Sequence, residues 1–170
     1  MSNDMKKRWV SIYVENEIGV LARISGLFSG KSYNIDSLSV GETEDRSVSR
    51  MTIAMTSDDK TFEQIKKQLN RSVEVIKVLD FTDIPIHMKE IMFVKINSCS
   101  EKDKEEAFRI AQVYGVKVVD YNKNTVLLEC SQTEEKNESL LKLLGSCFGY
   151  RLEVVRSGSV AIEAISYSER

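Results

Sequence analysis

Apolar residues recur at every second position near the start of the chain, where Val10, Ile12 and Val14 are separated by single residues. Such a two-residue period predicts a β-strand with one face on a core. Farther on, apolar residues recur at helical spacing, namely Val20, Ile24, Leu27 and Phe28. This stripe predicts an amphipathic helix, which Gly30 is placed to end.

The first half continues with a hairpin, a helix and a strand. Residues 35–56 contain two extended apolar segments around a polar turn at residues 41–46, as in a β-hairpin. A second helical stripe is formed by Phe62, Ile65 and Leu69. Either Asp58 or Asp59 is suited to cap the start of this helix, and the branched residues of 73–81 predict a strand. The predicted order is βαββαβ.

The same order is predicted again after Pro85, although the two halves share little residue identity. Residues 92–96 predict a strand, residues 116–130 a hairpin and residues 152–156 a last strand. Two helical stripes lie between them, formed by Ala107, Ile110, Ala111 and Tyr114 and by Leu140, Leu143, Leu144 and Cys147. Gly115 is placed to end the first of these helices.

We therefore expect an α+β chain with two ferredoxin-like βαββαβ domains in tandem. Residues 1–82 would form the first domain, residues 83–90 a linker, and residues 91–170 the second domain. Helices would cover only one face of each four-stranded sheet. The other face, on which Trp9 and Tyr13 are expected, would pack against the other half of the chain or against a second copy. A homodimer is expected in either case.

The charge balance argues against a nucleic-acid partner. The chain has 24 basic and 26 acidic side chains, a net charge of -2, whereas phosphate backbones select for excess positive charge. The longest apolar runs, such as residues 91–94, fall far short of the roughly 20 residues that cross a bilayer, so no membrane partner is expected. The polar N-terminus lacks the apolar region of a secretory signal, and the expected location is the cytoplasm.

The sequence gives little support for catalysis or metal binding. Its three cysteines, Cys99, Cys130 and Cys147, are widely spaced, and His87 in the predicted linker is the only histidine. These residues do not have the spacing of a zinc site, and a catalytic triad would depend on that single histidine. Glycine-rich phosphate-binding loops and the Gly-x-Ser-x-Gly motif are also absent. We therefore expect buried or half-buried free thiols, no metal site and no catalytic residues.

The segment that joins the first strand to the first helix has residue types suited to binding an amino acid. A helix N-terminus attracts a carboxylate, and Gly19 would let a ligand approach the backbone. The amide of Asn16 can bind a zwitterion, and Asn34 from a neighbouring subunit can face it. Val20, Leu21 and Ile35 would supply a small apolar pocket. The same residues also suit an ordinary turn and helix cap, so the residues alone leave both interpretations open.

Longer segments carry a resemblance to a known family. They are residues 14–24, 26–28, 33–35, 37–38, 43–45, 49–53, 63–65, 67–70, 90–92, 94–95 and 156–158. Together they closely resemble the regulatory small subunit of acetohydroxyacid synthase, also called acetolactate synthase. The resemblance spans nearly the whole chain from Trp9 onward and is most specific in the first half.

The resemblance implies an N-terminal ACT domain in a non-catalytic subunit that activates a thiamine-diphosphate-dependent catalytic subunit. It also implies feedback inhibition by valine in branched-chain amino acid biosynthesis. Valine would bind where two ACT domains pair, at the positions of Asn16, Gly19 and Asn34. Thiamine diphosphate, Mg and FAD would belong to the catalytic subunit alone. The chain departs from the family pattern at Ile18 and Arg46, where proline is frequent, and at Ser32, where glycine is frequent.

Two other classes of function fit the same predicted fold. One is a freestanding ACT-type amino acid sensor that regulates a different enzyme. The other is a small enzyme, because a ferredoxin-like scaffold does not by itself define a function. The single histidine and the lack of a convergent acid–base set count against the enzyme.

Overall fold

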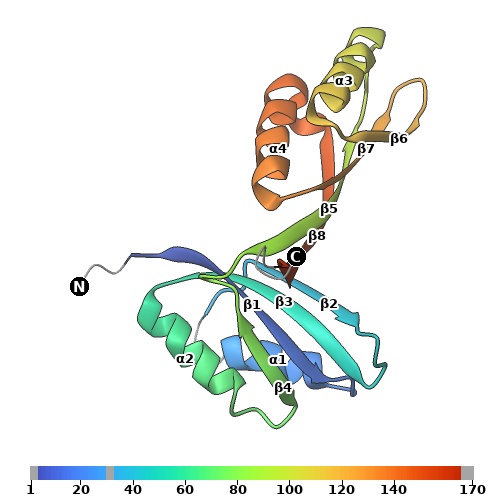
Figure 1. Ribbon diagram of the computed structural model, residues 1–170. Coiled ribbons are helices and arrows are strands. Elements are labelled where there is room, and N and C mark those ends of the chain that lie inside the picture. The colour runs from blue at the N-terminus through green and yellow to red at the C-terminus, as the bar shows by residue number, and fades with distance from the viewer. Residues whose placement is uncertain (1–3, 30–32, 166–170) are drawn as a thin grey trace. The chain divides into compact units, whose positions relative to one another are not determined.

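The computed structural model describes residues 4–29 and 33–165. The chain forms two compact units, shown together in Figure 1. Unit 1 comprises Met1–His87 and Ser159–Arg170, and unit 2 comprises Met88–Gly158. Unit 1 is therefore built from two separate stretches of sequence.

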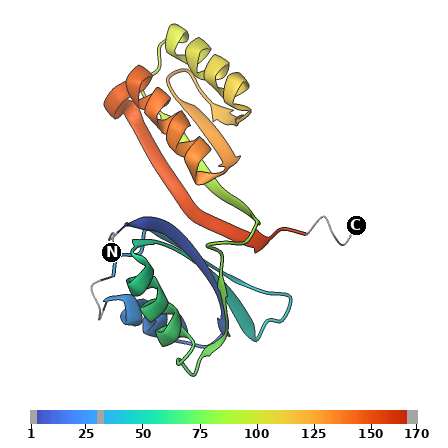
Figure 2. The ribbon, with the colours of Figure 1, turned by 60° about the vertical axis from the view of Figure 1, so that its left-hand side comes forward.

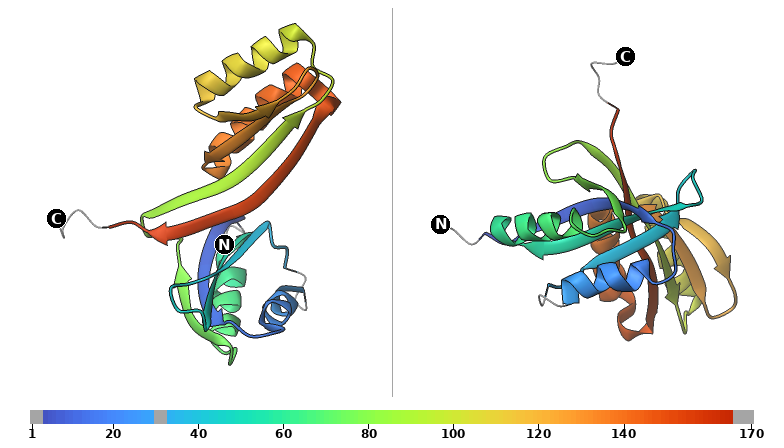
Figure 3. Two further views of the ribbon diagram at one scale, coloured as in Figure 1. Left: turned by 90° about the vertical axis from the view of Figure 1, so that its right-hand side faces the viewer. Right: turned by 90° about the horizontal axis from the view of Figure 1, so that it is seen from below.

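Unit 1 has the predicted βαββαβ order. Its elements are β1 (Lys6–Glu15), α1 (Val20–Ser29), β2 (Ser37–Glu42), β3 (Val48–Ser57), α2 (Asp59–Leu69) and β4 (Val75–Asp80). The strands form an antiparallel sheet in the order β2-β3-β1-β4. Both helices lie on one face of this sheet (Figure 3).

The core of unit 1 lies between the sheet and its two helices. Val10, Ile12 and Val14 are fully buried and pack with Ile24 and Phe28 of α1, as their spacing predicted. At the start of α2, the Asp58 side chain accepts a hydrogen bond of 2.7 Å from the Thr61 N–H, which selects Asp58 as the cap over Asp59. The predicted end of α1 at Gly30 lies outside the described residues.

Unit 2 repeats the order of unit 1. Its elements are β5 (Ile86–Ile96), α3 (Glu101–Tyr114), β6 (Lys117–Tyr121), β7 (Val126–Gln132), α4 (Glu134–Phe148), the 3-10 turn η1 (Gly149–Arg151) and β8 (Leu152–Glu163). The sheet order is β6-β7-β5-β8, and Figure 2 shows both helices on one face of this sheet. Gly115 ends α3 with a φ of +64°, as predicted. The predicted α+β class with two βαββαβ units is therefore confirmed.

An ionic network around a buried carboxylate joins α4 to the edge strand β8 and to its neighbour β5. Glu90 of β5 is 3% exposed. It accepts hydrogen bonds from Arg156 of β8, at 2.6 Å, and from Asn137 of α4, at 2.9 Å. Arg156 also pairs with Glu138. A buried carboxylate needs such partners because isolated charges are costly to remove from water.

The domain boundaries differ from those predicted. β5 begins at Ile86, so much of the expected 83–90 linker is strand, and His87 lies in that strand. β8 continues past Arg156 to Glu163, and its last residues belong to unit 1. The local sequence Ser-Gly-Ser at 157–159 is typical of a turn and predicts that the strand ends there. β8 continues because its later residues pair with residues far away in the sequence, which a local pattern does not show.

The face of unit 1's sheet opposite the helices carries Trp9 and Tyr13, because Val10, Ile12 and Val14 between and beside them point into the core. Ser11 on this face is fully buried. Arg50 donates hydrogen bonds to the Ser11 hydroxyl, at 2.8 Å, and to the Ala161 carbonyl, at 3.0 Å. The C-terminal part of β8 therefore lies against this face.

Candidate functional site

The turn between β1 and α1 exposes the start of a helix. Gly19 has a φ of +87°, a conformation that residues with a side chain rarely adopt, and it directly precedes Val20, the first residue of α1. The first bond of the helical pattern runs from the Arg23 N–H to the Gly19 carbonyl, at 3.0 Å. Of the N–H groups ahead of it, that of Val20 donates to the Glu17 carbonyl of the turn at 3.3 Å. The N–H groups of Leu21 and Ala22 have no acceptor within a helix and carry partial positive charge. This turn therefore has the geometry of an anion-binding site.

Asn16 is tied to the hairpin between β2 and β3. Its amide nitrogen donates to the Arg46 carbonyl, at 2.9 Å, and to the Glu42 carboxylate, at 3.3 Å. Its amide oxygen accepts from the Ser49 hydroxyl at 3.0 Å. Both N–H groups thus have partners inside the chain, while the oxygen keeps one lone pair for an ammonium group. Donation to a ligand carboxylate would require exchange of the long, exposed Glu42 contact.

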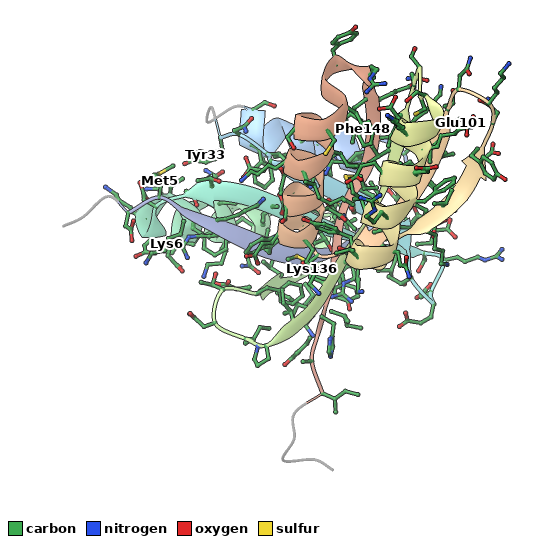
Figure 4. The ribbon with its side chains drawn as sticks, turned by 90° about the horizontal axis from the view of Figure 1, so that it is seen from above. Met5, Lys6, Tyr33, Glu101, Lys136 and Phe148 are labelled. Carbon is green, nitrogen blue, oxygen red and sulfur yellow. The ribbon has the colours of Figure 1, made fainter. Side chains whose placement is uncertain are left out.

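Asn34 lies in a different environment. Its amide donates to the Asp36 carboxylate at 3.2 Å. It also lines a pocket of about 360 Å³, together with Met5, Tyr33 and Ser57. Met5 and Tyr33 lie close together beside the beginning of β1 (Figure 4). This pocket is at the end of the sheet where β1 starts, whereas Asn16 follows the end of β1.

The two asparagines are too far apart to share one amino acid within a single chain. Asn16 contacts Ser49 near the start of β3, and the Asn34 pocket includes Ser57 at its end. Eight residues of extended strand span roughly 25 Å. A ligand that contacts both amides would therefore have to take one amide from each of two chains.

The predicted apolar pocket is only partly available. Val20 is 2% exposed and belongs to the core, so its side chain cannot line a binding pocket in this chain. Ile35 is partly buried against the same core. Leu21 is 46% exposed, and Ile18, which departs from the proline frequent in the family, is fully exposed. Ile18 was not predicted as a site residue, and the signal that could have identified it is an apolar residue within a polar turn.

Unit 2 fills the equivalent helix start with its own side chains. Ser100 caps α3, and Ser100 and Asp103 form a reciprocal capping box. The Asp103 carboxylate also accepts hydrogen bonds from Arg151, at 3.0 and 3.2 Å. Hydrogen bonding by Arg151 and Ser100 holds the pKa of Asp103 well below its usual range. A carboxylate of the chain therefore occupies this position in unit 2.

The cysteines are all free, and their environments differ. Burial raises the pKa of Cys130 to about 11, and Cys99 is shifted in the same direction for the same reason. Cys147 is exposed, contrary to the prediction. The buried stripe of α4 is Leu140, Leu144 and Phe148, because the larger Phe148 takes the core position next to Cys147.

Within residues 4–29 and 33–165, the structure was compared with the requirements of a metal site and of a membrane-spanning helix. There, no group of three or more His, Cys, Asp or Glu side chains is arranged to hold a metal ion. No helix in this part of the chain is long and apolar enough to cross a membrane.

Comparisons with known proteins give one consistent family. A family model described as an AHAS small subunit-like ACT domain matches residues 10–77, and one described as the small subunit of acetolactate synthase matches residues 89–165. The acetolactate synthase small subunit of Aquifex aeolicus is 40% identical over 158 residues, which cover 93% of this chain and 81% of that protein.

Two further similarities extend over almost the full length of both proteins compared. The acetolactate synthase small subunit of Mycolicibacterium smegmatis is 36% identical over 162 residues, 95% of this chain and 94% of that protein. The crystal structure of the Thermotoga maritima small subunit matches with a TM-score of 0.84 and 31% identity, covering 95% of this chain and 99% of the other.

Proposed function

The chain belongs to the family of acetolactate synthase small subunits, and we propose that it activates the catalytic large subunit and inhibits it when valine binds. Members of this family are regulatory and non-catalytic, and the ACT domain of this chain lies within unit 1. The proposed site of action is the cytoplasm. Thiamine diphosphate, Mg and FAD are proposed to bind on the catalytic subunit.

The exposed helix start at Gly19 is the observation that carries this proposal. The N–H groups of the first turn of α1 suit the carboxylate of valine. The free lone pair of the Asn16 amide oxygen suits its ammonium group. Leu21 and Ile18 are exposed beside this turn and suit its isopropyl group. The three chemical parts of valine would thus each have a complementary group.

A pair of chains is proposed to complete the site. The distance between Asn16 and Asn34 requires that Asn34 come from the second chain. The solvent side of α1 carries small residues at Ala22, Gly26 and Ser29, so two α1 helices related by a two-fold axis would approach closely. In that arrangement the beginning of one helix faces the end of the other. Valine would bind more tightly to this dimer arrangement than to others. Only that difference in affinity would transmit inhibition to the catalytic subunit.

The direct test is thermal unfolding of the purified chain with and without valine. A ligand at about 100 times its dissociation constant adds roughly 2.7 kcal/mol, which raises the midpoint by several degrees at this chain length. Leucine, isoleucine and glutamate serve as comparisons. A shift selective for valine supports the site. If valine gives none, the titration is repeated on the chain mixed with the catalytic subunit, and no valine effect there contradicts the proposal.

Gly19 offers a matched pair of variants for the same titration. Gly19→Asp places a negative charge at the proposed carboxylate seat, and we expect it to abolish the valine shift while activation of the catalytic subunit is retained. Gly19→Ala adds the same backbone strain without charge, and the new Cβ would lie 3.5 Å from Arg23, an ordinary contact. It should weaken the valine shift less. An unchanged shift in Gly19→Asp would place valine elsewhere.

A freestanding sensor that regulates another enzyme remains the alternative function. The two are separated by purification of the tagged chain from cells that express the catalytic subunit. Recovery of that subunit supports the proposal, and a valine-responsive chain that never recovers it favours the alternative.

A further inference from the structure

A small pocket lies on the open face of unit 1's sheet, the face opposite the helices. It has a volume of about 240 Å³, and β2, β3 and the C-terminal part of β8 line it. Arg50 and Thr52 of β3 point to this face, because Met51 between them is buried in the core. Gly41 of β2 pairs with Arg50, and Val160 of β8 also lines the pocket. These residues all belong to unit 1.

The Arg50 guanidinium is held in this pocket by neutral groups. Its Nε–H donates to the Ser11 hydroxyl at 2.8 Å, and Nη2 donates to the Ala161 carbonyl at 3.0 Å. The guanidinium carbon lies 5.1 Å from the centre of the Tyr13 ring. A guanidinium has five N–H donors, so these two bonds leave three donors that have no partner within residues 4–29 and 33–165. Arg50 is thus oriented by the chain and still able to bind a ligand.

The positive charge of Arg50 is not matched by a carboxylate of the chain. Among the residues that the structure describes, no aspartate or glutamate pairs with it. The two other described arginines that are shielded from solvent each pair with a carboxylate, Arg8 with Asp59 and Arg151 with Asp103. A shielded charge is costly unless an opposite charge accompanies it. The pocket therefore favours an anionic ligand.

The polar groups around Arg50 define the kind of anion. Thr52 is 5% exposed, and its hydroxyl forms no hydrogen bond with the residues that the structure describes. Glu42 also lines the pocket, but its side chain alternates with Gly41 to the helix side of β2, where it contacts Asn16. The ammonium group of an amino acid would therefore have no carboxylate partner here. A plain carboxylate with a neighbouring hydroxyl or keto oxygen fits better.

We propose that this pocket binds a small 2-hydroxy or 2-oxo monocarboxylate. The planar guanidinium of Arg50 matches a carboxylate with two parallel hydrogen bonds. The Thr52 hydroxyl suits the oxygen on C2, and Val160 suits a short aliphatic chain. The pocket has room for roughly eight non-hydrogen atoms, because liquid water takes about 30 Å³ per molecule. The ligand is therefore an acid of about four to five carbons or fewer.

The direct test is an NMR titration of the full chain that follows the Arg50 Nε–H signal, which is assigned by its loss in Arg50→Lys. The probes are 2-hydroxybutyrate and 2-oxobutyrate, and butyramide is the uncharged control. Both acids should shift this signal saturably, and butyramide should not. If neither acid shifts the signal, the proposal is wrong.

Gly41 offers a variant that fills the pocket and leaves Arg50 in place. A Cβ on Gly41 would meet no atom within 4 Å, and a β-branched residue suits a strand, so Gly41→Val should fold. Ser37→Val is the matched control, because Ser37 lies on the same face of β2 but outside the pocket. Affinity for 2-hydroxybutyrate should fall at least about tenfold in Gly41→Val, by steric exclusion, and stay unchanged in Ser37→Val. Equal affinity in Gly41→Val and wild type overturns the proposal.

Thr52→Val tests the contact that would select the oxygen on C2. The change keeps the shape of the side chain and removes its hydroxyl. The wild-type chain should bind 2-hydroxybutyrate more tightly than butyrate, because the extra oxygen has a hydrogen-bond partner. Thr52→Val should lose that preference and keep its affinity for butyrate. A preference that persists in Thr52→Val contradicts the proposed ligand class.

Two other ligands of Arg50 would give different results. Inorganic phosphate also suits a guanidinium, and if it shifts the Arg50 signal at the same concentrations as the acids, the pocket is a general anion site and the proposal is wrong. The proposal is also wrong if the catalytic subunit shifts this signal and the acids do not, because the carboxylate then belongs to that subunit.

The pocket does not depend on the proposed valine site. Gly19 lies in the turn between β1 and α1 and does not line the pocket. Gly19→Asp should therefore leave the affinity for 2-hydroxybutyrate unchanged, even where it abolishes the valine shift. Loss of both in Gly19→Asp would place the acid at the turn and contradict the proposal. Binding of the acid by a chain that shows no valine effect would support the pocket and count only against the proposed function.

Discussion

Ser11 and Phe93 occupy equivalent positions in the two units. In each unit the first strand has an apolar core residue that pairs with a core residue of the neighbouring central strand. This pair is Val10 with Ile53 in unit 1 and Met92 with Cys130 in unit 2, and Ser11 and Phe93 are the residues that follow Val10 and Met92. Ser11 is fully buried and bonded to Arg50, whereas Phe93 is 38% exposed. The same βαββαβ order therefore does not determine what happens on the face that helices leave open.

The size of the side chains is what differs. In unit 1 the open face carries Ser11, Thr52 and Ala54 on its central strands, all at most 5% exposed. Small residues let the chain at Ala161 approach closely enough to bond Arg50. Unit 2 carries the large apolar Phe93 at the place of Ser11, whereas Glu129 and Ser131 stand where unit 1 has Thr52 and Ala54, so the contrast rests on the central position.

The largest expected effect comes from giving unit 1 the side chain of unit 2. Ser11→Phe overfills a buried position and removes the acceptor of the Arg50 bond, so we expect unit 1 to lose about 4 kcal/mol of stability. Trp9 is the only tryptophan, and its fluorescence in urea reports unit 1. The reverse change, Phe93→Ser, should alter stability by less than about 1 kcal/mol, because Phe93 is partly exposed. Equal losses in the two variants would contradict the comparison.

The next largest effect concerns the ionic network of unit 2. Arg156→Ala leaves Glu90 buried without its cationic partner, and we expect a loss of about 3 kcal/mol. Cys130 is buried in the same unit, so pulsed alkylation of its thiol during urea unfolding reports the opening of unit 2. Arg156→Lys keeps the charge and should cost less. Trp9 fluorescence should be unaffected, and a matching loss in unit 1 would show that the network stabilises the whole chain.

The smallest effect is a change in pH dependence at the start of α3. The pKa of Asp103 is lower in the folded chain than in the unfolded chain, so its contribution is present above the ordinary pKa and is lost as the pH falls below it. Circular dichroism melts should show the midpoint of unit 2 falling with acid below about pH 4, and Asp103→Asn should flatten that fall. The Trp9 profile should be the same in both proteins. An identical acid profile for unit 2 would exclude Asp103 as its cause.

Local patterns predicted the elements well, since periodicity, caps and turn glycines act within a few residues. A helix cap at Asp58 or Asp59 and the helix end at Gly115 were predicted for that reason, and the structure selects Asp58. The bonds of Asn16 to Arg46 and Ser49 were not, because they join segments some thirty residues apart. Val20 belongs to the apolar stripe that predicted α1, and the residues of that stripe face the core. The prediction that Val20 also lines a ligand pocket therefore conflicted with the prediction of the helix.

The contact between Arg50 and Ala161 also fixes an order of events during synthesis. Unit 1 holds residues from both ends of the chain, with the whole of unit 2 encoded between them. At about 5–20 residues per second, a ribosome needs several seconds to pass from the end of the first stretch to the start of the second. Until then the first sheet emerges with Arg50 lacking its carbonyl partner. A nascent chain is thus exposed at this face until Ala161 leaves the ribosome.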